Sequence, residues 1–297
     1  MPFFHSASWS TEDGERFPAL ASLVDATRNC TAETFWNFSA AFEEFFNSSF
    51  VSSFLAHELG RIARTADYEH VQSDDEIEVL RGENFRVSIG KIKAYSPLGN
   101  DHTEVVCYAN DFVYANLGPI PLEFELLETP REQVNEVFDR SMVPYSVRIC
   151  RQQRGETIKV RAGVDILKVS KPERDTYQIY AVSSHPRKSL LWHYDADTLV
   201  PKYCTAASLM SSRVQTAINI LVRMGGQTTA TTAAIASAAK SGDHFVRWSA
   251  IAAVTSLDPH MGLELLQTAL ADPHPYVKAA AQSALVKLQG EGGANRG

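Results

Sequence analysis

A helical pattern repeats near the C-terminal end of the chain, and this repeat limits the possible folds more than any other feature of the sequence. A segment that begins at Asp243 returns about thirty residues later, so that Val246 aligns with Val277 and Ala250 with Ala281. A looser copy precedes both, at Ala217, Ile220, Leu221 and Met224. Periods in the low thirties are typical of arrays of paired helices that stack on one another. Residues 205–288 are therefore predicted to form a short helical stack.

The clearest copy, Asp272–Leu285, starts with an Asp-Pro turn. Val277, Lys278 and the small residues Ala279–Ala281 follow this turn. The order resembles the most characteristic part of HEAT repeats, although that family usually has arginine where this chain has Lys278. The resemblance covers the C-terminal third of the chain. It implies an architecture that holds protein surfaces together, and it does not identify a ligand.

Polar and aromatic side chains at the turns and helix starts of this stack are candidates for a protein interface. Trp248 belongs to a residue type that anchors many interfaces. The candidate set is His244, Arg247, Trp248, His274, Tyr276 and Lys278. Packing against the neighbouring repeat is the competing interpretation of the same side chains.

The middle of the chain has the alternation of apolar and polar residues that is typical of half-buried strands. The alternation occurs in the segments 85–89, 147–150, 157–161, 164–169 and 177–182. One helix is predicted to interrupt them, from Glu128 to Phe138. Short strands without helices at regular intervals favour an antiparallel sandwich or barrel over a parallel sheet. Residues 67–204 are therefore predicted to be a β-rich domain.

The succession of strands between Ile77 and Val200 resembles the jelly-roll barrel of cupins. The metal motif of that family has two histidines one residue apart, then a glutamate, and a further histidine in a later strand. No His-x-His sequence occurs in this chain, and His102 is the only histidine between Glu83 and Ser184. The resemblance therefore implies a barrel in which the usual metal site is absent or altered.

The first 66 residues are rich in aromatic side chains and are predicted to be helical from about Phe17 to Arg64. Steps of three and four residues, which place side chains on one helix face, separate Phe35, Phe38, Phe42 and Phe46. This stripe is predicted to be core, although an aromatic stripe can also line a ligand pocket. The acidic segment 67–83 is predicted to be a solvated connector.

Four residues near the end of the β-rich part form a candidate metal site: His185, His193, Asp195 and Asp197. In an extended segment the last three project to one side, because side chains alternate with a period of two. Imidazole and carboxylate groups suit zinc, iron or manganese. The competing interpretation is a strand that ends in an Asp-Ala-Asp-Thr turn, where the aspartates accept hydrogen bonds from backbone amides.

Basic residues gather between Arg148 and Arg174, where eight Lys or Arg residues occur against three acidic ones. A basic sheet face can bind phosphates or an acidic protein, and it can also be the solvated side of a sheet. Because the whole chain carries a net charge of −7, we do not expect nucleic acid as its partner.

The sequence begins without a basic segment and a following apolar stretch, so we expect no secretory signal. No apolar run approaches the ~20 residues that a membrane span requires. The four cysteines are far apart and lack paired spacing, as is usual for reduced thiols. We expect a cytoplasmic protein that does not contact a membrane.

Together these patterns predict an α+β chain in four parts: helical residues 1–66, β-rich residues 67–204, HEAT-like residues 205–288 and a disordered tail, 289–297. The favoured function is non-catalytic, namely a regulatory, assembly or scaffold protein. Its helical surface and β-rich domain would bind another protein or a small ligand, without a cofactor. The alternatives are a cupin-like enzyme that depends on Fe, Zn or Mn, and a sensor of a small molecule.

Overall fold

The computed structural model describes residues 4–5, 10–31, 33–64, 75–94, 103–130, 136–170, 172–225 and 228–294. The chain divides into two compact units, each of which is described by itself. The β-rich unit comprises Met1–Pro130 and Arg140–Tyr203, and the helical unit comprises Arg131–Asp139 and Cys204–Gly297.

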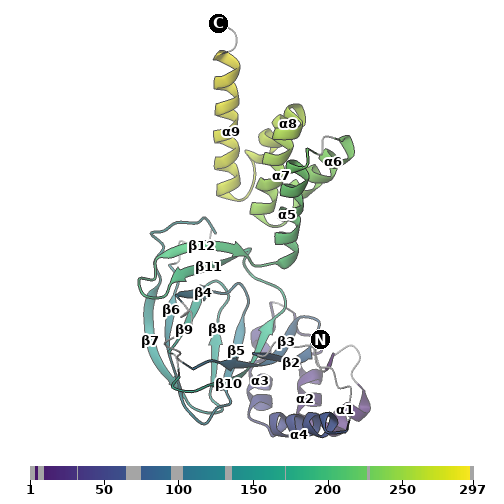
Figure 1. The fold of residues 1–297 in the computed structure, drawn as a ribbon, viewed down its shortest axis with the longest axis vertical. Coiled ribbons are helices and arrows are strands. Elements are labelled where there is room, and N and C mark those ends of the chain that lie inside the picture. The colour runs from purple at the N-terminus through teal and green to yellow at the C-terminus, as the bar shows by residue number, and fades with distance from the viewer. Residues whose placement is uncertain are drawn as a thin grey trace. The chain divides into compact units, whose positions relative to one another are not determined.

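Two six-stranded sheets form the body of the β-rich unit (Figure 1). Sheet A contains, in spatial order, β1 (Phe4–His5), β2 (Glu76–Arg81), β3 (Phe85–Ile92), β10 (Thr176–Ser183), β5 (Phe112–Asn116) and β8 (Thr157–Val160). Sheet B contains β12 (Pro201–Ala206), β11 (Leu190–Asp195), β4 (Glu104–Cys107), β9 (Asp165–Val169), β6 (Leu122–Glu128) and β7 (Tyr145–Gln152). The short β1 pairs parallel with β2, whereas the long pairs, such as β3 with β10 and β6 with β7, are antiparallel. The prediction of an α+β chain with antiparallel sheets is confirmed.

Sheet A is the middle layer of this unit, because side chains on both of its faces are buried. In β5, Val113 and Ala115 belong to a core shared with the N-terminal helices. Phe112 and Tyr114 belong to a second core, which includes Phe124 of sheet B. Since successive side chains of a strand point to opposite faces, one strand supplies both cores.

The N-terminal helices cover one face of sheet A. They are α1 (Thr11–Arg16), α2 (Pro18–Ala26), the 3-10 helix η2 (Phe35–Phe38), α3 (Ser39–Phe46) and α4 (Phe50–Ile62). Phe35, Phe42 and Phe46 are at most 4% exposed, and Phe38 packs against the same cluster. The prediction that the phenylalanine stripe is core is confirmed.

Short polar side chains interrupt the helical segment that the sequence predicts as one stretch. After α3, Ser48 donates a hydrogen bond from Oγ to the Phe45 carbonyl and accepts one from the Phe50 amide. Asn47 donates from its side-chain amide to the Glu43 carbonyl. Such local bonds compete with the helical pattern and end a helix.

All five strands expected from alternation are present, as β3, β7, β8, β9 and β10. The acidic segment differs in part from its prediction, because β2 begins at Glu76 and buries Val79 and Leu80. The helix predicted from Glu128 to Phe138 lies partly outside the described residues, at 131–135. Of the rest, Glu128 ends β6 and residues 136–138 are not helical. Pairing of β6 with β7 and β9 on its two sides holds Glu128 in a strand.

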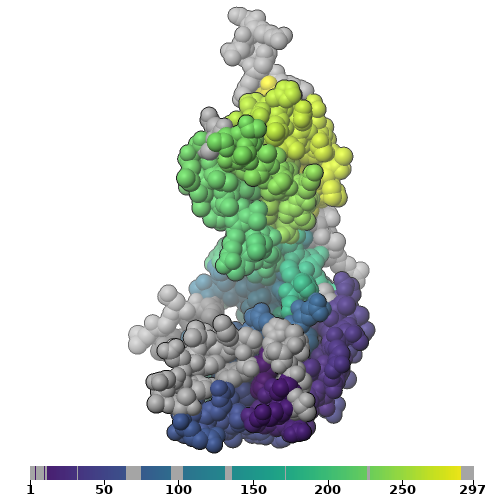
Figure 2. Space-filling model, turned by 90° about the vertical axis from the view of Figure 1, so that its right-hand side faces the viewer, coloured from purple at the N-terminus to yellow at the C-terminus, as the bar shows by residue number. Residues whose placement is uncertain are grey.

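The C-terminal helices expected from the sequence are present in the helical unit. They are α5 (Leu209–Arg223), α6 (Thr229–Ser237), the 3-10 helix η4 (Ala238–Lys240), α7 (His244–Leu257), α8 (Pro259–Ala269) and α9 (Pro275–Ala294). Helix α7 is central, since Ala250 and Val254 join the core beside α5 and α6 while Ile251 joins the core beside α8 and α9. In Figure 2 these helices, green to yellow, form a closely packed body.

Val277 lies in the core of the helical unit, as its place in the repeat predicts. It is fully buried beside Ile251, Leu266 and Ala281. We expect Val277→Ala to lower the free energy of unfolding by about 1–3 kcal/mol, because it removes buried methyl groups. Urea denaturation followed by circular dichroism measures this change, with Val286→Ala in the same helix as the control, since Val286 is 65% exposed. An unchanged midpoint for Val277→Ala would show that this face is not core.

The end of α9 differs from the predicted start of the tail. The helix continues past Gln289 to Ala294, and residues 295–297 lie outside the described residues. Gln289 and Glu291 favour helices, whereas each of the three glycines between Gln289 and Ala294 lowers helical stability by about 1 kcal/mol.

No helix among the described residues combines the length and the apolar composition that crossing a membrane requires.

Candidate functional site

A cavity of about 380 Å³ opens in the β-rich unit at the free edge of β8, and we call it the β8 cavity. It is lined by Trp36, Leu126, Arg148, Lys159, Arg161 and Asp165. These residues come from η2 and from the region of four strands, so the chain assembles the cavity from segments distant in sequence.

The position of β8 in sheet A explains why side chains from both layers meet here. Lys159 aligns with Val113, which faces the N-terminal helices, whereas Ile158 and Val160 face sheet B. Lys159 therefore lies on the helix side of the sheet, where η2 supplies Trp36. From sheet B, Leu126 and Arg148 are direct cross-strand partners and share one face.

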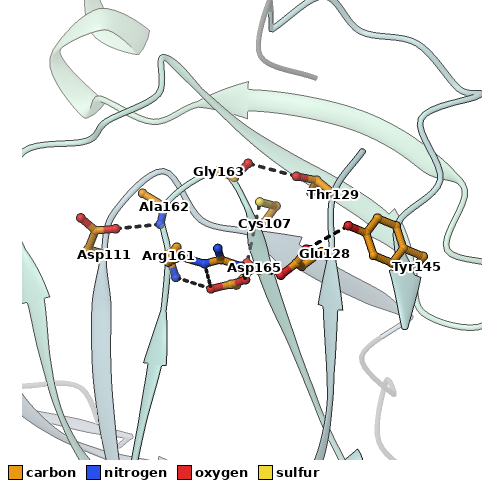
Figure 3. Close-up of polar contacts among 9 residues, drawn as sticks. All are labelled: Cys107, Asp111, Glu128, Thr129, Tyr145, Arg161, Ala162, Gly163 and Asp165. Atoms are coloured by element: carbon orange, nitrogen blue, oxygen red, sulfur yellow. Dashed lines mark hydrogen bonds and ion pairs between the residues drawn. The ribbon is translucent and has the colours of Figure 1, made fainter. Parts of the chain in front are cut away.

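Arg161 and Asp165 both line the cavity and bind each other (Figure 3). The carboxylate of Asp165, which is 3% exposed, accepts hydrogen bonds from Arg161 N, Nε and Nη2 at 2.7, 2.9 and 2.7 Å. Arg161 Nη2 also donates to Glu128 Oε1 at 2.5 Å, and Tyr145 donates its hydroxyl to Glu128 Oε2 at 2.9 Å. These bonds raise the pKa of Arg161 above its ordinary value, with Asp165 as the main cause. The guanidinium is therefore already engaged by two carboxylates.

A second buried carboxylate, that of Asp111, also stabilises the turn between β8 and β9. Asp111, which is 2% exposed, accepts a hydrogen bond from the Ala162 amide at 2.8 Å and pairs with Arg187. Within the turn, Gly163 has a φ of 66°, which favours glycine, and its carbonyl accepts a bond from the Thr129 hydroxyl (Figure 3). Asp111, Asp165 and Arg161 thus have a structural role in this turn.

Arg148 and Lys159 are less engaged than Arg161. The Arg148 side chain has no hydrogen bond or ion pair to any residue that the structure describes. Lys159 Nζ donates to Ser39 Oγ at 2.9 Å and lies 3.7 Å from Glu43 Oε1, in a pair whose side chains are 48% and 41% exposed. Exposed pairs of this kind contribute about 0–1 kcal/mol. The cavity therefore contains two cations that a ligand can reach.

The space between the two sheets is aromatic and apolar. The rings of Phe112 and Tyr114 stack at 5.3 Å, and both contact the ring of Tyr180. Burial raises the pKa of Tyr114 and of Tyr180 above the ordinary value. Phe124 completes this cluster from sheet B.

The structure places the predicted metal residues in separate contacts. His185 forms a hydrogen bond from Nε2 to Asn84 Oδ1 at 2.9 Å. His193 stacks on Tyr203 at 4.5 Å, with Nδ1 3.6 Å from Glu104 Oε2, and burial lowers its pKa. Within the described stretches of the chain, no three His, Cys, Asp or Glu residues are grouped so that they could hold a metal ion.

Asp195 caps the turn that follows β11. Its Oδ1 accepts hydrogen bonds from the Asp197 amide at 3.2 Å and from the amide and hydroxyl of Thr198 at 2.9 Å each. These bonds, those of Thr198 first, lower the pKa of Asp195. This is the arrangement that the turn interpretation of the sequence describes.

We expect the purified protein to contain well under one iron, zinc or manganese ion per chain, because His193 and Asp195 already have these other partners. Mass-spectrometric metal analysis of the full chain, expressed in medium that contains all three metals, measures this content. About one tightly held ion per chain, lost in His193→Ala but kept in the exposed control His260→Ala, would contradict the expectation.

The predicted interface residues of the helical unit divide into two groups. Arg247 forms a two-point ion pair with Asp272, at 2.8 and 2.7 Å, and donates to the Ser241 and Gly242 carbonyls. Half-buried Trp248 packs against the core that contains Val277.

Of the other interface candidates, His244 is buried, whereas Tyr276 and Lys278 are exposed. His244 is 6% exposed and stacks on His274 with the ring centroids 3.7 Å apart. Tyr276 is 45% exposed, and Lys278 is exposed. Their role in binding a partner stays a prediction.

The stability of the protein should fall between pH 6.5 and about 4 because of His244. Burial, with His274 and Arg247 beside it, lowers the pKa of His244 to about 4 from the ordinary 6.5, whereas Asp243 and Asp272 oppose this shift. The unfolded chain therefore binds a proton in this interval that the folded chain does not, and stability is lost as pH falls. Urea midpoints at pH 7 and pH 5 measure the loss, and His244→Phe, which cannot titrate, should reduce it. An equal loss in both proteins would contradict this assignment.

Comparison with known proteins gives a partial likeness of fold. No family model and no curated protein matches the chain. Among solved structures it is similar to the DMSP lyase DddQ from Ruegeria pomeroyi DSS-3, at 8% identity over 35% of this chain and 40% of that chain, with a TM-score of 0.23. It is also similar to the cupin domain of Cnp3 from Schizosaccharomyces pombe, at 10% identity over 41% and 72%, with a TM-score of 0.25. A sugar phosphate isomerase from a cupin superfamily, from Silicibacter pomeroyi, matches at 9% identity over 42% and 68%, with a TM-score of 0.23.

These neighbours include cupin-domain proteins, as the strand pattern suggests, and the match spans two fifths of the first of them. The metal ion of cupins does not fit the donors that this structure describes. Phe112, Tyr114 and Phe124 occupy the space between the sheets, and His102 lies outside the described residues. We therefore derive no chemistry from a metal in this chain.

Trp36 and Leu126 are cavity residues that the sequence did not indicate, because no local pattern links either of them to the basic segment. Arg148, Lys159 and Arg161 belong to the basic segment that the sequence did indicate. Only the fold separates the cations that face the cavity from those that face elsewhere.

Proposed function

We propose that this protein binds a small organic molecule in the β8 cavity, through side chains alone, and does not catalyse a reaction there. The observation that carries this proposal is the composition of the cavity wall. Trp36 and Leu126 offer apolar surface, while Arg148 and Lys159 offer cationic donors, and the Glu43 pair of Lys159 is exposed. Small-molecule sites usually combine a largely apolar wall with a few polar groups that fix orientation.

The hydrogen bonds of Asp165 and Glu128 favour a binding site over a catalytic one. A general base must be able to take a proton from a substrate. The carboxylate of Asp165 instead accepts three hydrogen bonds from Arg161, and Glu128 accepts bonds from Arg161 and Tyr145. Asp165 would have to give up hydrogen bonds from Arg161, and Glu128 those from Arg161 and Tyr145, before either could accept a proton from a substrate.

A cupin-like enzyme remains the alternative function. This alternative is supported by the two antiparallel sheets and by the cavity in the same unit. Two of the named structural neighbours are a lyase and an isomerase. A bound ion found by the metal analysis above would favour this alternative.

For the helical unit we propose HEAT-like packing and the binding of another protein. The support is the ion pair of Arg247 with Asp272, which joins the start of α7 to the turn before α9. An aspartate also precedes α7, as Asp243, and it accepts a hydrogen bond from Ser211 near the start of α5. Similar polar links thus recur at successive helix starts, as expected for stacked repeats. Exposed Tyr276 and Lys278 at the start of α9 are the proposed contacts.

A ligand screen on the full chain tests the cavity proposal. Compounds that bind the folded state raise its melting temperature, by an amount that depends on affinity and concentration. We expect hits among small molecules of one or two rings. Trp36→Ala should weaken the binding of these compounds, whereas Trp248→Ala should not. Folding of each variant is checked by circular dichroism. Hits that bind Trp36→Ala as well as they bind the original protein, or a screen without hits, would overturn the proposal.

A further inference from the structure

We propose that the ligand of the β8 cavity is an organic anion, with a carboxylate or phosphate group on a flat apolar body. Arg148 and Lys159 bind the anionic group, and Trp36 and Leu126 contact the body. This inference rests on the proposed function and adds the chemical class of the ligand and the residues that select it.

The charges around the cavity support this class. The protein as a whole carries a net charge of −7, yet three of the six lining residues are cations and one is an anion. Arg161 is paired with two carboxylates, those of Asp165 and Glu128. Arg148 has no partner among the described residues, and Lys159 has only the exposed pair with Glu43, so both cations have donors left for an anionic group. A neutral or cationic ligand would gain less from these donors than an anion does.

The placement of the two cations supports recognition from two sides. Arg148 comes from β7 of sheet B, and Lys159 comes from β8 of sheet A. A guanidinium offers a planar pair of donors that matches carboxylate and phosphate oxygens, and an ammonium adds a compact charge. A ligand oxygen near Lys159 competes with Glu43, whose Oε1 is 3.7 Å away, and with the hydroxyl of Ser39. Both competitors are weak, so the ligand replaces them at little cost.

The apolar lining and the size indicate what the anion carries. Trp36 is half-buried and presents a ring, and Leu126 is 7% exposed. Inorganic anions would leave this surface uncovered. A volume of about 380 Å³ lies near the lower end of the ~300–1,000 Å³ typical of small-molecule sites. A compound with one ring fits this description better than a nucleotide.

Calorimetry with simple probes tests the class of ligand. The probes are benzoate, phenyl phosphate, benzamide as the neutral counterpart, and inorganic phosphate. We expect benzoate or phenyl phosphate to bind at least about tenfold more tightly than benzamide, because a charge-assisted hydrogen bond is worth about that factor. Inorganic phosphate should bind more weakly than phenyl phosphate. Whichever of benzoate and phenyl phosphate binds more tightly shows whether the ligand carries a carboxylate or a phosphate group.

Matched variants test the residues. Arg148→Gln and Lys159→Gln should each lower the affinity for the anionic probe by about tenfold and leave the affinity for benzamide unchanged. Arg151→Gln is the control, since Arg151 lies on the same strand but points to the opposite face, where its Nε is 3.8 Å from Glu123 Oε1. Melting temperatures confirm that each variant folds.

The outcomes distinguish this inference from the proposed function. Benzamide binding as tightly as benzoate, or an equal loss in Arg151→Gln and Arg148→Gln, would overturn the anion class while a cavity ligand remained. If inorganic phosphate bound as tightly as phenyl phosphate, the inference that the ligand has an apolar body would be wrong. If no anionic probe binds but neutral compounds from the screen do, the class is wrong and the proposed function stands. If neither binds, both fail.

Discussion

Replacement of Arg247 by alanine should lower the free energy of unfolding of the helical unit by about 3–5 kcal/mol, because removal of one partner from a buried ion pair leaves the other charge unpaired. The side chains of Arg247 and Asp272 are 12% and 9% exposed. Arg247 also satisfies the carbonyls of Ser241 and Gly242. Urea denaturation of the full chain, followed by circular dichroism at 222 nm, measures the loss.

Two further variants show whether the effect belongs to this ion pair. Arg213→Ala removes an exposed arginine from α5 and should change the midpoint little. Arg247→Lys keeps the charge but lacks the planar two-point geometry, so its stability should lie between those of the original protein and Arg247→Ala. If Arg247→Ala were no less stable than Arg213→Ala, the pair would not hold these helices together.

Phe42→Ala should lower the free energy of unfolding of the β-rich unit by about 3–5 kcal/mol, the usual cost of removing a fully buried phenylalanine. Phe42 is fully buried, with ring centroids 5.5 Å from Phe35, 6.2 Å from Phe46 and 5.7 Å from Phe85. Its removal leaves a cavity where helix α3 meets sheet A. Guanidinium denaturation measured by tryptophan fluorescence is a suitable assay.

Leu59→Ala is the matched control for this core substitution, since Leu59 lies on the neighbouring helix α4 and is 66% exposed. It should cost less than about 0.5 kcal/mol, as is usual for surface positions. A similar loss in the two variants would mean that the phenylalanine stripe does not form the core between α3 and sheet A.

The sequence predicted strands best where one face is apolar and the other polar. The segments at β3, β7, β8 and β9 had this alternation, and each is a strand. β10 was also predicted, although Ile179 and Val182 are buried in two different cores. β5 was not predicted, because Phe112 and Val113 face two different cores and both are buried. Strands buried on two faces lose the period of two. β6 does alternate, as Leu122 and Phe124 are buried and Glu123 is exposed, so its signal was present in the sequence.

The candidate site was less predictable than the fold. The basic segment between Arg148 and Arg174 contains three of the cavity residues, but its alternation does not show which cation faces a cavity. Arg161 and Lys159 are two positions apart, yet Arg161 is occupied by Asp165 and Lys159 is accessible. His185 and His193 are close in sequence, but a turn and a strand direct them to different partners. Such differences depend on contacts between distant segments, which a local pattern does not contain.

The order of strands in sheet A has a consequence for the synthesis of the chain on the ribosome. The N-terminal helices share their core with Ile179 and Ala181 of β10, and β10 lies between β3 and β5. At about 5–20 residues per second, these helices emerge roughly 6 to 24 seconds before β10, which completes their core, is synthesised. During that interval we expect the core around residues such as Phe42 and Phe54 to be incomplete. Expression at lower temperature, or with additional chaperones that bind exposed aromatic segments, should therefore increase the yield of folded protein.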